Sequence, residues 1–170
     1  MNQNNNGENE LKVSEEEKFD SLLDSYENSI GLSLIPKDLE FTCMKYLYLS
    51  QDELKKMSSE DCAEACVLLN SFAFHLSRML NREKAKLRWC NEKILKAVSS
   101  KLTDYRYFSP EERMALSVRD DDYAQKVKML AVKIQARIDR TEYLPIRIEK
   151  VSDTLSNLSY SKRKNNERNI

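Results

Sequence analysis

Basic side chains gather in two stretches of the sequence, and binding of phosphate or other anions is the chemistry that such stretches can perform. The segment 78–106 holds nine Lys/Arg against three Asp/Glu, and the segment 161–170 holds four against one. Trp89 lies within the first stretch, so cations stand beside one stacking surface, a pairing typical of single-strand binders. The candidate DNA-binding residues are Arg82, Lys86, Arg88, Lys93, Lys96, Lys101, Arg106, Lys162, Arg163 and Lys164.

Two alternatives stay open for these residues. A charged face on a long helix is also what ordinary solvation produces, with no ligand involved. Tyr105, Tyr107 and Phe108 surround Arg106, and aromatics interleaved with cations can stack on bases. Three aromatics can equally close a small core, so their pattern fits both readings.

Catalytic and metal chemistry find little support in the sequence. It has no nucleophile elbow and no glycine-rich phosphate loop, and His75 stands alone between two apolar residues. Cys43, Cys62, Cys66 and Cys90 lack the paired short spacing of a zinc knuckle, and buried cysteines commonly serve as small core residues. We therefore expect reduced, buried thiols, no metal, no cofactor and no enzymatic activity.

Composition limits the elements that can position these side chains. Only two Gly and three Pro occur in 170 residues, too few for the tight turns of a multi-stranded sheet, whereas 41% apolar residues suffice for a modest helical core. No apolar run approaches the roughly 20 residues that cross a bilayer, and no signal peptide is recognisable. These features predict an all-α cytoplasmic protein without a membrane contact.

The formal net charge of zero conceals a division along the chain. Residues 1–60 carry 6 Lys/Arg against 13 Asp/Glu, and residues 61–170 carry 22 against 15, so the two parts have charges of −7 and +7. The acidic front can compete with a nucleic acid for the basic part, and we expect its removal to tighten DNA binding.

Four segments follow from the patterns. Residues 1–13 are Asn-rich and acidic with little to bury, which predicts a disordered tail. Residues 14–57 predict short helices, because caps and breakers interrupt the apolar spacing. Residues 58–160 predict a helical-hairpin core, and residues 161–170 a basic flexible tail.

Within the short-helix segment, Ser14 is the expected start of the first helix and Gly31 its end. Two further helices are expected at about 37–49 and 51–57, the second opened by a capping box at Ser50.

Two apolar seams of similar length predict the hairpin. The first follows a cap at 58–61 and continues without Gly or Pro to about Leu102, which makes a helix of over forty residues and about 60 Å. The second follows Asp120–Asp122, where three acids favour a helix start, and Pro145 should bend or divide it. The expected fold is thus a long antiparallel helical hairpin with short N-terminal helices. Its first seam is Cys66, Leu69, Ala73, Leu76, Leu80, Glu83, Leu87, Cys90, Ile94, Ala97 and Lys101, and its second is Tyr123, Val127, Leu130, Ile134, Ile138, Thr141, Leu144, Ile148, Val151, Leu155 and Leu158.

The connector at 104–118 and the outer faces add two expectations. Ser109-Pro110-Glu111-Glu112 combines an N-cap, an N1 proline and two acids, which predicts a short helix at the hairpin tip. Apolar residues outside the seams should stay partly exposed and drive homo-oligomerisation. These residues are Phe72, Met79, Trp89 and Ile146.

The order of these features resembles the phage UvsY recombination mediators over about residues 61–164. The matching positions are Leu87-Arg88, Lys93, Asp104-Tyr105, Leu116-Ser117, Asp120, Asp122 and Ser161-Lys162-Arg163. The resemblance implies a hairpin subunit that forms a ring, binds single-stranded DNA and helps load a RecA-like recombinase onto strands covered by single-strand binding protein. It carries over the end of the first long helix, with Lys93, Lys96 and Lys101, as the DNA-contact region, whereas the acidic front departs from the family.

Two functions therefore follow as hypotheses. One is a single-stranded DNA-binding recombination mediator that works as a homo-oligomer in the cytoplasm, that of the host cell if the chain is phage-encoded. The other is a non-catalytic hairpin adaptor that binds a partner protein through the tyrosine-rich surface at 41–49 or the acidic front, without nucleic acid.

Overall fold

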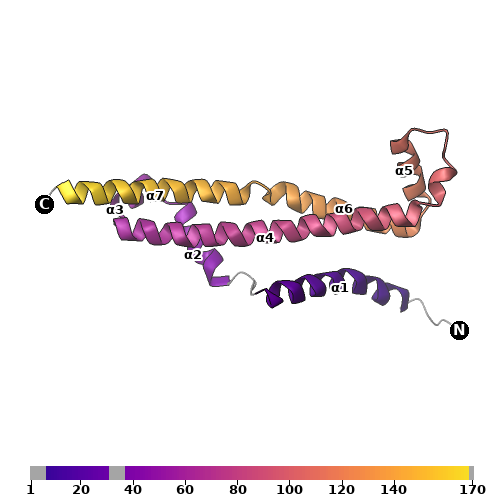
Figure 1. Cartoon of the computed structure of the whole chain (residues 1–170), viewed down its shortest axis with the longest axis horizontal. Helices are drawn as coiled ribbons and strands as arrows, with labels where there is room; N and C mark the ends of the chain where they lie inside the picture. Colours follow the sequence, from indigo (N-terminus) through magenta and orange to yellow (C-terminus); the bar gives the residue numbers. More distant parts are fainter. Residues whose placement is uncertain (1–6, 31–36, 169–170) are drawn as a thin grey trace. The chain divides into compact units, whose positions relative to one another are not determined.

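The computed structural model describes residues 7–30 and 37–168, and every regular element in these ranges is a helix, which confirms the all-α class (Figure 1). No helix within the described ranges is long and apolar enough to cross a membrane. The elements are α1 (Gly7–Ser29), α2 (Lys37–Leu47), α3 (Gln51–Lys56), α4 (Ser59–Val98), the 3-10 helix η1 (Lys101–Thr103), α5 (Pro110–Arg119), α6 (Asp122–Thr141) and α7 (Leu144–Arg168).

The chain divides into two compact units, Met1–Ile35 and Pro36–Ile170. The helix of the first unit, α1, begins at Gly7, before the expected Ser14. Of the predicted disordered tail, residues 1–6 lie outside the described residues, as does Gly31, the expected helix end.

Local capping explains where α3, α4 and α5 begin. Ser50, Ser58 and Ser109 each accept a bond from the backbone N–H three residues on, and the carboxylate at that later position accepts from the backbone N–H of the serine. These are capping boxes, which satisfy donors that the first helical turn leaves unpaired. The three helix starts predicted from the sequence are confirmed.

In the second unit α4 runs antiparallel to α6 and α7 (Figure 1). Ser59 near the start of α4 accepts from Ser159 of α7 at 2.7 Å, and Lys84 farther along α4 pairs with Glu142 after α6 at 2.9 Å. The first long helix ends at Val98, four residues before the expected Leu102, and continues through a turn into η1.

The second long helix is divided where a bend was predicted. α6 ends at Thr141 and α7 begins at Leu144, so Pro145 is the second residue of α7. Proline has no N–H to continue the ladder and its ring crowds the preceding turn, which ends α6 here. One seam position is lost at the break, because Leu144, expected inside, is 40% exposed, whereas Ile148 and Leu155 are buried as predicted.

Two hydrophobic clusters hold the hairpin together. At one end α2 and α3 pack against α4 and α7, and at the other α4 packs against α6, with α5 beside them. Small residues allow close contact between helices: Cys66 donates through Sγ to the Ser152 carbonyl, and Ser152 donates through Oγ to the Cys66 carbonyl, both at 3.2 Å. The buried residues of the two clusters are Cys43, Ala65, Cys66, Leu69, Phe72, Ala73, Ile148 and Leu155, and Cys90, Ile94, Val98, Ala124, Val127, Ala131, Ile134 and Ile138.

Two expectations need correction. Phe72 was expected to stay partly exposed, but it is buried in the cluster that includes Cys43 of α2, because α2 folds onto α4. The segment expected to be a flexible tail from residue 161 is helical, since α7 continues to Arg168 and the sequence has no Gly or Pro after Pro145 to end it.

Candidate nucleic-acid interface

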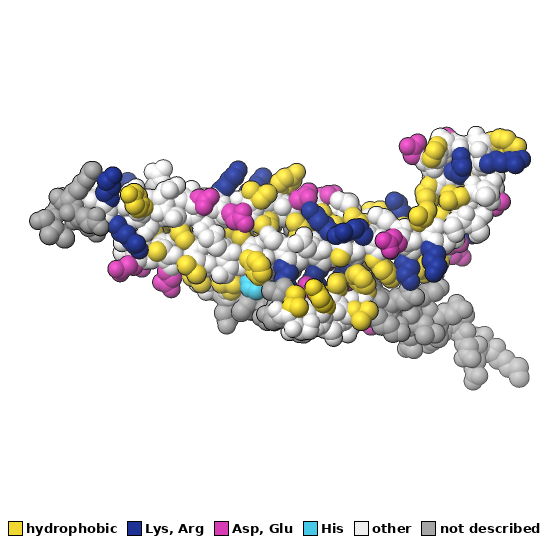
Figure 2. Space-filling view, in the orientation of Figure 1, with side chains coloured by type: hydrophobic (Ala, Val, Ile, Leu, Met, Phe, Trp, Pro, Cys, Tyr) yellow, Lys and Arg dark blue, Asp and Glu magenta, His cyan; other side chains and the backbone are white. Residues whose placement is uncertain are grey.

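A stripe of exposed cations runs along the outer face of α6. Lys126, Lys133 and Arg140 are spaced seven residues apart, so they lie on one side of the helix over about 21 Å. The buried residues of α6, such as Val127 and Ile134, lie on its inner side. Figure 2 shows Lys and Arg side chains along this part of the hairpin and at the end that carries α5. We call Lys126, Lys133, Arg137 and Arg140 the α6 stripe.

One carboxylate connects the α6 stripe to cations of α4. Arg137 donates through Nε to Oε2 of Glu83 at 2.8 Å, and the Lys86 ammonium lies 3.8 Å from Oε1 of the same group. Glu83 thus shares a single negative charge between two cations on different helices. The contact keeps an excess of positive charge where α4 and α6 meet.

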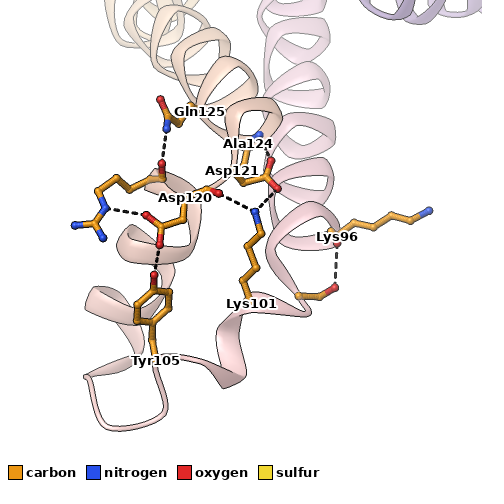
Figure 3. Close-up of polar contacts among 9 residues, drawn as sticks. Lys96, Lys101, Tyr105, Asp120, Asp121, Ala124 and Gln125 are labelled. Atoms are coloured by element: carbon orange, nitrogen blue, oxygen red, sulfur yellow. Dashed lines mark hydrogen bonds and ion pairs between the residues drawn. The ribbon is translucent and has the colours of Figure 1, made fainter.

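The hairpin tip is fixed by a lysine that reaches across the chain reversal. Lys101 donates to the Asp120 carbonyl at 2.8 Å and to Oδ2 of Asp121 at 2.9 Å (Figure 3). Asp121 also caps α6 by accepting from the Ala124 N–H at 2.9 Å. That backbone bond and then Lys101 lower the pKa of the Asp121 carboxyl. Lys101 therefore joins the end of the first long helix to the start of the second.

A second polar group holds the loop before α5. The Tyr105 hydroxyl donates to Asp120, whose other carboxylate oxygen accepts from Arg119 Nε at 2.9 Å (Figure 3). The bond from Tyr105 and then that from Arg119 lower the pKa of Asp120, and the contact with Asp120 raises the pKa of Tyr105. The Tyr105 ring also meets Phe108 edge to face, with 6.1 Å between ring centroids.

Arg106 and Tyr107 occupy the outside of this loop. Tyr107 is 84% exposed, and the guanidinium carbon of Arg106 lies 4.8 Å from its ring centroid. Arg106 also donates through Nη2 to the Tyr107 hydroxyl at 2.8 Å. The pair presents a cation and an aromatic ring together to solvent.

The candidates on α4 occupy different surroundings. Arg82 is half-buried, and the exposed Arg88 donates through Nε to the Lys84 carbonyl at 3.4 Å. The Lys93 ammonium lies 5.4 Å from the Trp89 ring centroid, a cation–π contact. Lys96 is exposed, and its side chain extends away from the contacts around Lys101 (Figure 3).

The three consecutive basic residues near the end of α7 also separate. Lys162 points its ammonium at α3, where it donates to the carbonyls of Leu54 at 2.9 Å, Lys55 at 3.1 Å and Met57. These carbonyls belong to the last turn of α3 and its C-cap, where a cation is favourable. Arg163 and Lys164 are exposed.

The ten candidates therefore do not form one site. Lys101 and Arg106 lie at the tip, whereas residues 162–164 lie toward the other end of the hairpin, about 60 Å away along the helices. The α6 stripe was not among the sequence candidates. Its signal was the seven-residue spacing of cations, each directly before a residue of the second seam and so beside the seam, which a helical projection of residues 122–141 would have found.

The cysteines and His75 are the remaining residues that were considered for site chemistry. All four cysteines are buried and unpaired by disulfides, and burial raises the pKa of Cys43 and Cys62. Among the described residues no group of three or more His, Cys, Asp or Glu could hold a metal ion. His75 is half-buried and its ring meets Phe74 edge to face.

Comparisons with known proteins do not add a family. No protein-family model, no curated protein and no solved structure matches this chain.

Proposed function

We propose that this chain binds single-stranded DNA through its basic hairpin and acts as a recombination mediator that helps load a RecA-like recombinase. The observation that carries DNA binding is the α6 stripe, in which exposed Lys126, Lys133 and Arg140 share one face turned away from the core. Cations in a row can follow a phosphate backbone, and each phosphate contact releases a counterion.

The charge division supports this proposal despite the zero net charge. The part of the chain that contains the hairpin, residues 61–170, carries 22 Lys/Arg against 15 Asp/Glu. Such contacts read no base sequence, so we propose binding without marked base preference. The mediator role, with a single-strand binding protein as a further partner, rests on the resemblance to the UvsY proteins, and we propose the cytoplasm as its place.

Homo-oligomerisation is part of the proposal. Met79 on α4 is 51% exposed, and Tyr143 and Ile146 at the junction of α6 with α7 are 63% and 51% exposed. Apolar area on the outer side of a helix favours association with a partner. A second copy would multiply the number of basic stripes, so that weak phosphate contacts add up as avidity.

Electrophoretic shift of a single-stranded oligonucleotide at about 50 mM and about 200 mM salt tests DNA binding. We expect a shift at the lower salt and a steep loss at the higher, because counterion release makes affinity fall with salt. Light scattering on the same protein should give a mass several times that of one chain. Absence of a shift at the lower salt contradicts DNA binding, and a monomer mass contradicts the oligomer.

The location is tested by charge reversal. Lys126→Glu, Lys133→Glu and Arg140→Glu together should weaken binding at least about tenfold at low salt, since several phosphate contacts are lost. The matched control is Lys55→Glu with Lys56→Glu, two exposed lysines on α3. Helix content should stay unchanged in both, because exposed charges contribute little to folding. An equal loss in the control would place the DNA elsewhere.

The adaptor remains a second candidate because α2 presents an apolar stripe. Phe41 and Met44 lie three residues apart on α2, and Tyr48 follows in the turn after its end; the three side chains are 85%, 40% and 77% exposed. The opposite face of α2 contributes Cys43 to the core. If the DNA shift fails, binding of a partner protein through this stripe takes the place of the mediator.

A further inference from the structure

We propose that Tyr107 is a base-stacking residue that gives the protein its preference for single strands over duplex. The inference rests on the proposed function, and it assigns to the hairpin tip a role different from that of the α6 stripe. The α6 stripe binds phosphates of any nucleic acid, whereas an exposed ring binds only bases that are not already stacked in a duplex.

The three neighbouring aromatic residues of this loop have two different roles. Tyr105 and Phe108 pack against each other, and the Tyr105 hydroxyl is used by Asp120. Tyr107 lies between them in sequence but is 84% exposed, far more than Phe108 at 49%. Its large apolar ring faces solvent on a loop whose other two aromatics supply the packing.

The loop that carries Tyr107 is held on both sides. The Phe108 N–H donates to the Tyr105 carbonyl at 3.0 Å, and Arg113 donates through Nη2 to the Phe108 carbonyl at 3.2 Å. Asp120, the C-cap of α5, fixes Tyr105 through its hydroxyl. A ring whose backbone is fixed in advance loses less conformational freedom when a base stacks on it.

Arg106 supplies the second part of the recognition. Its guanidinium lies against the Tyr107 ring and donates to the hydroxyl, so the ring is oriented by a cation. The same guanidinium has further N–H donors that can meet the phosphate next to a stacked base. The carboxylate of Glu112, which could otherwise compete for Arg106, accepts hydrogen bonds from Ser109 in its capping box. Base stacking and phosphate binding thus come from adjacent residues.

The test compares a normal single-stranded oligonucleotide with one of equal length that consists of abasic sites. Tyr107→Ala should bind the normal strand about 5- to 100-fold more weakly, the size of one base–aromatic stack, and bind the abasic strand as the wild type does. Tyr107→Phe, which keeps the ring, should restore binding to the normal strand. An equal loss on both strands, or no loss on either, would overturn the stacking role.

A matched control and a separate readout keep the result interpretable. Tyr160→Ala removes another exposed tyrosine, 69% exposed on α7, and should leave both affinities unchanged. Tyr107→Trp should have its fluorescence quenched by the normal strand and much less by the abasic strand. Wild-type protein that binds neither strand refutes the proposed function and this inference with it, whereas wild-type binding with an unaffected Tyr107→Ala refutes the inference alone.

Discussion

The lysines of this protein have different roles, although they look alike in the sequence. Lys101 and Lys162 direct their ammonium groups at backbone carbonyls and, for Lys101, at a carboxylate. Lys164, two residues from Lys162, is exposed on α7. A lysine that donates its N–H groups to another element holds the two elements together, whereas a lysine on an exposed face is available to a ligand.

This difference predicts different effects for substitutions at Lys162 and Lys164. Lys162→Met should lower the free energy of unfolding by about 1–2 kcal/mol, because the last carbonyls of α3 lose a charged donor. Lys164→Met should change it by less than about 0.5 kcal/mol and weaken DNA binding instead. Urea unfolding followed by circular dichroism measures the first quantity. Equal stability of the two variants would show that Lys162 does not hold α7 to α3.

The elements of this protein depend on charged caps at their starts. In each of the three capping boxes the hydrogen bond from the serine hydroxyl, followed by that from the serine backbone, lowers the pKa of the carboxyl: Glu53 in α3, Asp61 in α4 and Glu112 in α5. Asp121 at the start of α6 has a lowered pKa as well. Four helices thus have, in the first turn or at the cap, a carboxylate whose pKa folding lowers.

A pH dependence of stability follows from these lowered values. Near pH 4 and below, the unfolded chain takes up protons that the folded chain resists, so the stabilisation is complete above the usual carboxyl pKa of about 4 and is lost as the pH falls through the folded values. We expect the thermal midpoint to fall between pH 6 and pH 3. Asp61→Asn should reduce this fall, and Asp153→Asn, an exposed acid outside the caps, is the control. A fall of the same size in Asp61→Asn would contradict the capping account.

At the scale of the whole molecule, opposite charges are divided along the chain. Residues 1–60 have a charge of −7 and residues 61–170 a charge of +7. Acids that lie within about a Debye length of a bound polyanion repel it. We therefore expect the acidic front to weaken DNA binding at low salt, where the Debye length is longest.

Neutralising part of the front tests this. Glu15→Gln, Glu16→Gln and Glu17→Gln together should tighten binding of single-stranded DNA about twofold or more at low salt, because three repulsive charges are removed. The gain should vanish at high salt, where screening shortens the reach of the charges to a few ångström. Fluorescence anisotropy of a labelled oligonucleotide measures both. Unchanged affinity at low salt would exclude an electrostatic role of these acids.

The sequence by itself determined the all-α class, the starts of α3, α4 and α5, and the break at Pro145. Caps at Ser50, Ser58 and Ser109 act on backbone groups within one turn, and the seams repeat every three or four residues. Residues close together in the sequence are therefore sufficient to cause these features. Only the tertiary structure decided that Phe72 is covered by α2, that Lys162 reaches α3, and that Tyr107 rather than Tyr105 is exposed. Each of these outcomes depends on which element folds against which, because burial and hydrogen-bond partners far apart in the sequence are set by packing and leave no local periodicity to read.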